Sequence, residues 1–395
     1  MATDELERVR EYGLDALFDP ERRRAAAAYA SARRRWELVN TLLLLMYFAA
    51  WVLSGAGLRL GDWVATSVPW PWAQVALAFL IVGFGAWVLD TLSAIPAERL
   101  ARRYGQSTQD WEHWFTDRVK AGLLEGGIGL LMVEILYALL STGSSVWWLW
   151  ASLLVAAFLV LLTIIMPVFI APIFFRFTPI EDEELRQRLL RLAENVGVPA
   201  LDVYRFDMSA RTTAANAAVI GLGSTRRIVL ADTLLSSFSA DEIEGVLAHE
   251  LAHHVHRDMM WTLLMSSVLG VFALLLLNWV LKGASALWGV PVNSPHMVPV
   301  LFLFFSLYSL AAMPLTNMWF RGREWLADMF AVQVTGRGRV YAQALARLAD
   351  QNLAELWPPE WYVFWFGSHP PLGDRILLAW REEEDASPDL QPSGV

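Results

Sequence analysis

The sequence predicts a mainly α-helical, multi-span membrane protein with about six transmembrane helices and a small α+β unit inserted between two of them. Hydrophobic residues make up 56% of the chain and charged residues only 18%, whereas soluble domains have about 45–50% apolar and 25% charged residues. The apolar residues form long, charge-poor runs, each near the twenty or so residues that cross a bilayer. The polar stretch 176–258 interrupts these runs and contains the motif H-E-x-x-H.

Six apolar runs divide the chain into segments. The predicted spans are 37–58, 72–95, 119–140, 146–167, 259–281 and 297–320. The predicted segments are a cytoplasmic N-terminal segment 1–36, four spans in 37–175, the α+β region 176–258, two spans in 259–320, a cytoplasmic segment 321–381 and a disordered tail 382–395. The apolar run 168–175 is too short to cross a bilayer, so we expect it to enter the interface or to begin the polar region.

The distribution of arginine predicts which side of the membrane each segment occupies. Six spans place both termini and both polar segments on one side, with the loop that contains Arg99, Arg102, Arg103 and Arg118. The opposite loops carry only Arg59 and Lys282. Because cytoplasmic loops have the excess of positive charge, the H-E-x-x-H motif is predicted to face the cytoplasm. The N-terminus has no pattern of a signal peptide.

Three acidic residues, Asp90, Glu125 and Glu134, lie within predicted spans. Ionisable groups at membrane depth are costly and usually face protein or water. One interpretation is therefore that the spans enclose a wet cavity. The other is that these acids lie near the interfaces, where the ends of the spans are uncertain.

Composition excludes several kinds of chemistry. The chain has no cysteine, which rules out disulfides, iron–sulfur clusters, thiol nucleophiles and cysteine zinc sites. Any metal must therefore be bound by His, Asp or Glu. The net charge of -9 argues against a nucleic-acid partner.

The polar region before the fifth span has the pattern of a small α+β unit. We expect a helix over 181–196, a strand over 201–207 and a hairpin formed by 217–222 and 228–230. Ser239 and Glu242 then form a capping box that begins a helix. This helix carries the H-E-x-x-H motif and leads directly into the fifth span.

The motif itself consists of His249, Glu250 and His253. Residues four apart lie on one face of a helix, so the two histidines can bind one metal ion. Glu250 lies beside them, where it can take a proton from the attacking water. The alternative is a surface helix that happens to be rich in histidine.

A catalytic zinc site needs a third protein ligand. Glu324 and Asp328 follow the sixth span, four residues apart and on the same side of the membrane as the histidines. We expect Glu324 to complete the site and Asp328 to accept the free N–H of a ligating histidine. The alternative is a solvated helix face. We expect His254 to lie at the surface or behind the ligands. His256 is a possible alternative ligand, but it lies too far along the helix axis to share an ion with both His249 and His253.

Four motifs, in their order along the chain, resemble those of the type I CaaX prenyl protease family. The members of this family are membrane zinc metalloproteases of the gluzincin kind. They are Asn216-Ala217, HELAH at 249–253, EWLAD at 324–328 and SHPPLGDRI at 368–376. The resemblance covers roughly residues 20–380, and Asp258 after the motif is closer to the related bacterial quality-control proteases. The family's eukaryotic members carry a seventh span, whereas this sequence predicts six.

The resemblance implies a role for each matched residue. His249, His253 and Glu324 would bind one Zn²⁺, Glu250 would be the general base, and Asp328 would support the site. His369 would stabilise the oxyanion, with Arg375 supporting the site. The resemblance also implies that Asn216 and Ala217 lie on an edge strand that pairs with an extended peptide.

These features predict a zinc metalloendopeptidase that is an integral membrane protein. We expect it in a bacterial inner membrane, with its site facing the cytoplasm. Its partners would be a peptide or protein substrate, including a prenylated C-terminal peptide, and membrane lipids. The alternatives are a quality-control protease acting on misfolded membrane proteins, an inactive zinc-binding scaffold, and a transporter. An intact Glu250 disfavours the scaffold, and the lack of inverted repeats disfavours the transporter.

Overall fold

The computed structural model describes residues 2–221, 223 and 226–386. Within these residues, six helical segments are long and apolar enough to cross a membrane, as the sequence predicts. They are α2 (Pro20–Leu53), α4 (Pro71–Arg103), α5 (Trp111–Ser141), α6 (Trp147–Ile165) continued by a π-helical turn and α7 (Ala171–Phe174), α11 (Asp258–Trp288) and α12 (Val298–Thr335). The run after Pro167 therefore extends the fourth span.

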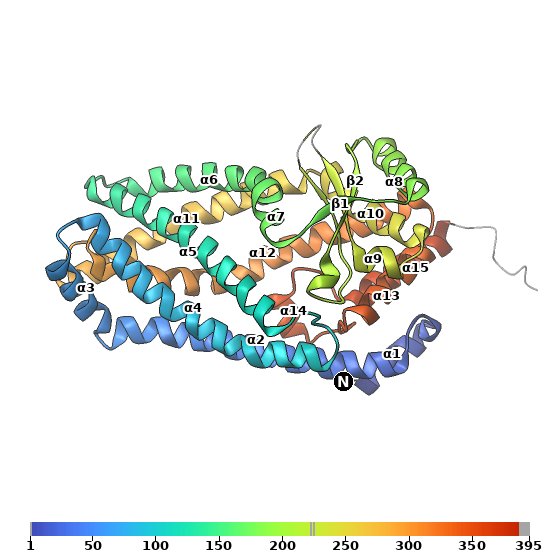
Figure 1. The fold of residues 1–395 in the computed structure, drawn as a ribbon, viewed down its shortest axis with the longest axis horizontal. Helices are drawn as coiled ribbons and strands as arrows, with labels where there is room; N and C mark the ends of the chain where they lie inside the picture. The colour runs from blue at the N-terminus through green and yellow to red at the C-terminus, as the bar shows by residue number, and fades with distance from the viewer. Residues whose placement is uncertain (1, 222, 224–225, 387–395) are drawn as a thin grey trace, which may run out of the picture.

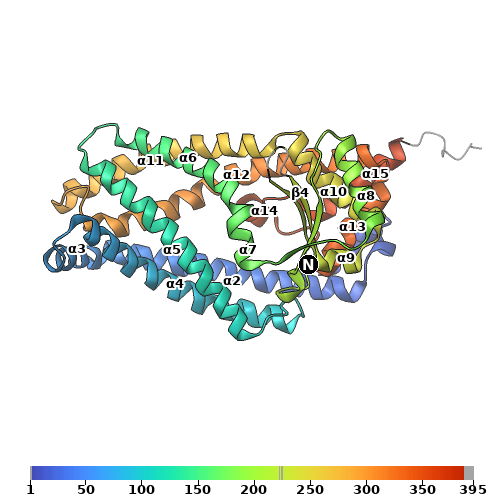
Figure 2. The ribbon, with the colours of Figure 1, turned by 45° about the horizontal axis from the view of Figure 1, so that its top comes forward.

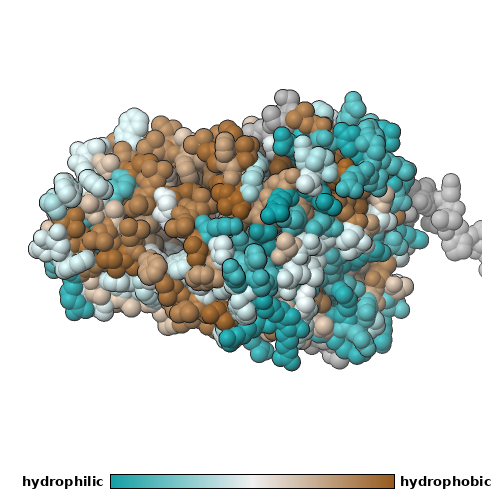
Figure 3. Space-filling model, in the orientation of Figure 1, coloured by the Kyte–Doolittle hydropathy of each residue, from teal (hydrophilic) through white to brown (hydrophobic). Residues whose placement is uncertain are grey.

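The long helices and the polar region form the two ends of an elongated molecule (Figures 1 and 2). The apolar surface covers the end built from the long helices, and the hydrophilic surface covers the end that contains the sheet (Figure 3). Two buried clusters follow the same division. One joins the sheet to the helices around it, and the other joins the membrane helices to one another.

The inserted region contains a four-stranded sheet with the order β1-β2-β4-β3. Strands β3 (Ala217–Ile220) and β4 (Arg227–Ala231) pair antiparallel, which confirms the predicted hairpin. Strand β2 (Val203–Phe206) lies parallel to β4, and β1 (Phe177–Pro179), which the sequence did not predict, pairs antiparallel with β2. The helices of this region are α8 (Glu183–Asn195), η3 (Met208–Ala210), α9 (Asp232–Ser237) and α10 (Ala240–Val255).

The remaining helices flank the membrane helices and the sheet. They are α1 (Ala2–Glu11), η1 (Asp15–Leu17), α3 (Ala56–Ser67), η5 (Pro295–Met297), α13 (Gly338–Gln351), α14 (Glu360–Phe366) and α15 (Leu372–Ala386). Helix α15 reaches Ala386, inside the segment 382–395 that we expected to be disordered, because the glutamates after Trp380 are good helix formers. Residues 387–395 lie outside the described residues.

The helix that carries the H-E-x-x-H motif does not run directly into the fifth span, although the sequence predicts that it does. Helix α10 ends at Val255, and Arg257 has a φ of 56°, in the left-handed region. A non-glycine residue in that region ends a helix. Helix α11 begins at Asp258, so the turn separates the motif from the membrane span.

One intramembrane acid has partners. Asp90 on α4 accepts a hydrogen bond from Asn40 Nδ2 at 2.8 Å and forms an ion pair with Arg118 on α5. Arg118 is part of the arginine-rich loop region, so this acid lies toward the end of the spans that the loop closes. By contrast, one buried carboxylate oxygen of Glu134 has no hydrogen-bond partner among the described residues.

Candidate metal centre

Helix α10, which carries the H-E-x-x-H motif, has a defined N-terminal cap. Ser239 Oγ accepts from the Glu242 amide, and the Glu242 carboxylate accepts from the Ser239 amide at 2.8 Å, which confirms the predicted capping box. Leu247 and Leu251 are fully buried against the domain core. Because these leucines fix which face of α10 is buried, the motif residues are held in one orientation.

The structure brings Glu324 of α12 to the two histidines of α10. His249 Nε2 lies 3.3 Å from one Glu324 carboxylate oxygen, and His253 Nε2 lies 3.5 Å from the other. The three ligand atoms all lie within 4.8 Å of one another. Among the residues that the sequence proposed as ligands, these three are therefore brought together from two separate helices.

A buried network holds His249. Asp328 Oδ1 lies 2.9 Å from His249 Nδ1, which leaves Nε2 directed toward Glu324. Tyr341 donates to Asp328 Oδ1 at 2.7 Å, and Arg375 donates to both Asp328 oxygens at 2.7 and 2.8 Å. Asp328 is 0% exposed, so its charge is compensated entirely by these neighbours.

A second carboxylate holds the other histidine. Asp258, the first residue of α11, has its Oδ2 atom 2.8 Å from His253 Nδ1. Arg323 Nε donates to Asp258 Oδ1 at 2.6 Å. Each histidine of the motif is therefore oriented by its own carboxylate, and each carboxylate by its own arginine.

The charges of the site shift the pKa values of its groups. Burial favours neutral His249, but Asp328 and Glu324 outweigh burial and raise its pKa to about 9. Burial raises the pKa of the Glu250 carboxyl, which makes Glu250 a stronger proton acceptor.

The donor set fits a zinc ion. Two imidazole nitrogens and one carboxylate are the protein ligands of many catalytic zinc sites. Glu324 Oε2 is buried and accepts no hydrogen bond from the described residues, so it has free capacity to bind a cation. Asp328 and Asp258 supply the outer carboxylates that usually orient zinc-bound histidines.

His369 lies at the edge of this cluster in the loop between α14 and α15. Its Nε2 atom is 3.6 Å from Glu324 Oε1, and its side chain is 59% exposed. Ser368 Oγ lies 2.9 Å from His369 Nδ1. His256 contacts the ring of Phe330 instead of the ligands, and it is outside the group of ligand atoms that share a centre.

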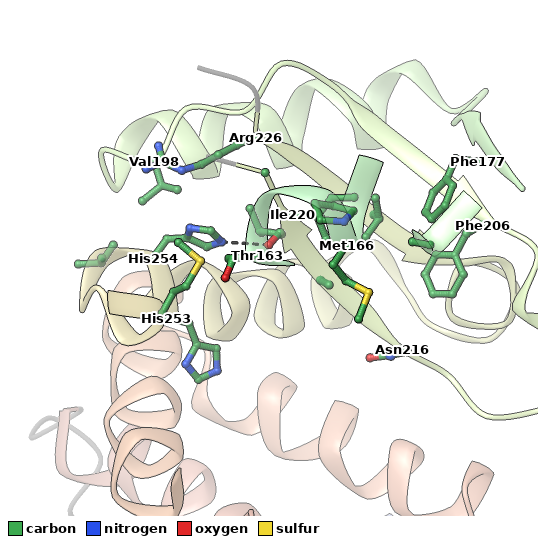
Figure 4. Close-up of a pocket in the computed structure, with 18 of the residues that line it drawn as sticks. Thr163, Met166, Phe177, Val198, Phe206, Asn216, Ile220, Arg226, His253 and His254 are labelled. Carbon is green, nitrogen blue, oxygen red and sulfur yellow. Dashed lines mark hydrogen bonds between the residues drawn. The ribbon is translucent and has the colours of Figure 1, made fainter. Parts of the chain in front are cut away.

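A cavity of about 980 Å³ opens beside His253 (Figure 4). One face of the sheet, the C-terminal end of α6 and the start of α11 line it. Its lining is mostly apolar and includes Met166, Phe177, Phe206, Ile220 and Met260. Asn216, just before β3, also lines the cavity, whereas Ala217 is buried. The predicted pair at 216–217 therefore lies at the sheet edge near the motif.

The sequence did not predict a role in the site for three residues of the network. Tyr341 comes from α13 and contacts His249 and Asp328, and no local spacing points to it. Arg323 bonds to Asp258, 65 positions away in the sequence, and no local spacing indicates this contact. Asp258 could have been found, since it follows His253 by five residues and begins the next apolar run.

Two family models together match most of the chain. Residues 179–381 match the model of peptidase family M48, and residues 10–176 match the model described as the N-terminal region of CAAX prenyl protease, with five membrane helices. The described part of 10–176 has four candidate spans, one fewer than that description.

Relatives cover most of the chain. The uncharacterized metalloprotease YhfN of Bacillus subtilis is 29% identical over 95% of this chain and 89% of its own length. CAAX prenyl protease 1 of Saccharomyces cerevisiae is 30% identical over 70% of this chain. The matched region covers 65% of that protein. The crystal structure of S. mikatae Ste24p shares the fold, with a TM-score of 0.81 at 24% identity, covering 93% of this chain and 91% of that one.

Proposed function

The chain belongs to peptidase family M48, and we propose that this integral membrane metalloprotease is a zinc endopeptidase that binds about one Zn²⁺ per chain. One observation carries the proposal. His249, His253 and Glu324 place their ligand atoms within 4.8 Å of one another, with Glu250 next to the first histidine.

The residues of the site would divide the work of peptide hydrolysis. Bound zinc would polarise the scissile carbonyl and make the attacking water more acidic. Glu250 would accept a proton from that water and pass it to the leaving amine. His369 would donate a hydrogen bond to the developing oxyanion. Arg375 would act through Asp328, which it holds in place beside His249.

The substrate would bind as an extended peptide along β3, near Asn216 and Ala217. The apolar cavity beside His253 supports a substrate with bulky apolar groups. A prenylated C-terminal peptide meets this requirement, and so does an unfolded segment of a membrane protein. The second substrate class would make the protein a quality-control protease.

We place the site at the cytoplasmic face of a bacterial inner membrane. The support is the arginine bias around Arg99–Arg118 and the similarity to a Bacillus subtilis metalloprotease over 95% of the chain. We also propose that the polar segments 1–36, 176–258 and 321–381 lie on this cytoplasmic side.

The test is a measurement of metal content and proteolysis on the same purified protein. Zinc is quantified by mass spectrometry, and casein, a prenylated C-terminal peptide and its unprenylated counterpart are offered as substrates. Cleavage by the wild type and none by Glu250→Ala would support the proposal. Zinc binding without cleavage of any substrate would instead indicate an inactive scaffold. Material that co-purifies with Glu250→Ala would identify the substrate class.

A further inference from the structure

Four polar residues share one face of α12. They lie at positions 317, 321, 324 and 328, and steps of three and four residues return to the same face of a helix. Glu324 and Asp328 belong to the candidate metal centre. Arg321 and Asn317 come one and two turns earlier on this face, and the proposed hydrolysis does not use them.

Both of these side chains bind the end of α14. Asn317 Nδ2 donates to the Trp365 carbonyl at 2.6 Å. Arg321 Nη1 donates to the Val363 carbonyl at 2.9 Å and to the Gly367 carbonyl at 2.7 Å. Carbonyls at the C-terminal end of a helix commonly need donors from outside it. These three hydrogen bonds supply such donors and attach the end of α14 to α12.

The loop that carries His369 begins where α14 ends. The Gly367 carbonyl belongs to the peptide bond that leads into this loop, so Arg321 fixes the position of that peptide bond. At the other end of the loop, Arg375 on α15 donates to both oxygens of Asp328 at 2.7 and 2.8 Å. Both ends of the loop are therefore attached to the same face of α12.

The side chain of His369 is weakly restrained by comparison. It is 59% exposed, and its Nε2 atom lies 3.6 Å from Glu324 Oε1, too far for a hydrogen bond. Its Nδ1 atom lies 2.9 Å from Ser368 Oγ, which belongs to the same loop. The direction of His369 toward the candidate metal centre therefore depends mainly on where the backbone of the loop is held.

We propose that Asn317 and Arg321 are positioning residues, which hold the start of this loop so that His369 faces the candidate metal centre. The inference rests on the proposed function, in which His369 donates a hydrogen bond to the oxyanion. Such a bond strengthens in the transition state, so its loss lowers kcat and leaves KM nearly unchanged. Asn317 and Arg321 bind carbonyls and not the three ligands, so zinc content should stay the same.

The effect of losing Arg321 should depend on His369. Displacement of a catalytic group by about 1 Å can lower a rate about 100-fold, so we expect Arg321→Ala to lower kcat about 10- to 100-fold. If Arg321 acts through His369, this loss disappears once His369 has been removed. A general structural role would lower kcat by the same factor with and without His369.

The experiment is a double-mutant cycle of Arg321→Ala and His369→Ala. A fluorogenic peptide, built on a cut that the wild type makes in casein, gives kcat and KM, and zinc is quantified on the same samples. We expect His369→Ala to lower kcat about 100- to 1,000-fold. The double variant should match His369→Ala within about two-fold. Arg321→Lys keeps a charged donor and should recover part of the kcat that Arg321→Ala loses.

Two further variants complete the series. Asn317→Leu removes the other donor, should lower kcat about two- to ten-fold, and gives a second cycle with His369→Ala if Arg321→Ala folds poorly. Arg22→Ala is the matched control, because Arg22 also donates from Nη1 to a backbone carbonyl, that of Asp350, at 3.1 Å. It should keep the wild-type kcat.

Hydrogen exchange tests the anchoring without any catalysis. In protein stripped of zinc, the amides of Ser368 and His369 should exchange about ten-fold faster in Arg321→Ala than in the wild type, because the loop opens more often. Arg22→Ala should exchange at the wild-type rate. Unchanged exchange in Arg321→Ala would show that Arg321 does not hold the loop.

The cycle can also overturn the inference. Equal losses of kcat from Arg321→Ala with and without His369, at equal zinc content, would do so. Loss of zinc in Arg321→Ala, or wild-type kcat in His369→Ala, would do the same. In all three cases the wild type remains a zinc-dependent protease. Absence of cleavage by the wild type, at about one zinc per chain, would count against the proposed function itself.

Discussion

His249 Nδ1 lies 2.9 Å from Asp328 Oδ1, and this contact joins the motif helix to the helix that leaves the sixth span. With Nδ1 engaged, Nε2 is the nitrogen that faces Glu324. His253 is oriented in the same way by Asp258, which belongs to a third helix. The orientation of the ligand set therefore depends on how α10, α11 and α12 pack together.

Asp328→Asn and Asp258→Asn should each weaken zinc binding. Carboxylates that orient ligating histidines typically contribute 10- to 100-fold in metal affinity, and we expect a loss of about this size for each change. The affinity is measured by competition with a chromogenic chelator. Tyr341→Phe keeps the Asp328 carboxylate and should cost less than Asp328→Asn. A zinc affinity that is unchanged in both Asn variants would show that neither carboxylate orients a ligand.

Glu250→Ala should abolish hydrolysis while zinc remains bound. Glu250 is the only acid inside the H-E-x-x-H motif, and general-base catalysis typically contributes about 10²- to 10⁴-fold to a rate. Casein hydrolysis and zinc content are measured on the same sample. Glu181→Ala, at an exposed position before α8, serves as the control. Full activity of Glu250→Ala would refute the proposed mechanism.

Glu324→Ala should release zinc, because only two of the three proposed ligands remain. The expected result is a fall from about one zinc per chain to a small fraction of that after dialysis, together with loss of proteolysis. Glu360→Ala, at the exposed start of α14, should retain its metal. Wild-type zinc content in Glu324→Ala would mean that another acid or histidine completes the site.

Local patterns predict much of the fold and the residues that the structure brings together at the candidate metal centre. Runs of apolar residues predict the six spans, and helical spacing with a capping box predicts α10 and the pairing of His249 with His253. Contacts between distant segments leave no such local signal. Tyr341 reaches His249 from 92 positions away in the sequence, and the strand β1 depends on its pairing with β2 more than on its three residues. The left-handed turn at Arg257 likewise has no glycine to mark it.

Acid should weaken the anchoring of α10 at its first turn. Asp241, in the first turn of α10, forms ion pairs with Arg188 of α8 and with Arg337, which precedes α13. The hydrogen bond from Arg188 is the main cause of the lowered pKa of Asp241. A carboxyl whose pKa is lowered by folding stabilises the protein above its unfolded pKa, near 4, and loses that contribution as the pH falls through its folded pKa. Asp241→Asn should therefore lower the unfolding temperature at pH 7 but bring it closer to that of the wild type below about pH 4. Thermal unfolding in detergent between pH 7 and pH 3 measures the difference, and acid release of zinc affects both proteins alike. A difference that stays constant across this range would show that the charge of Asp241 does not contribute.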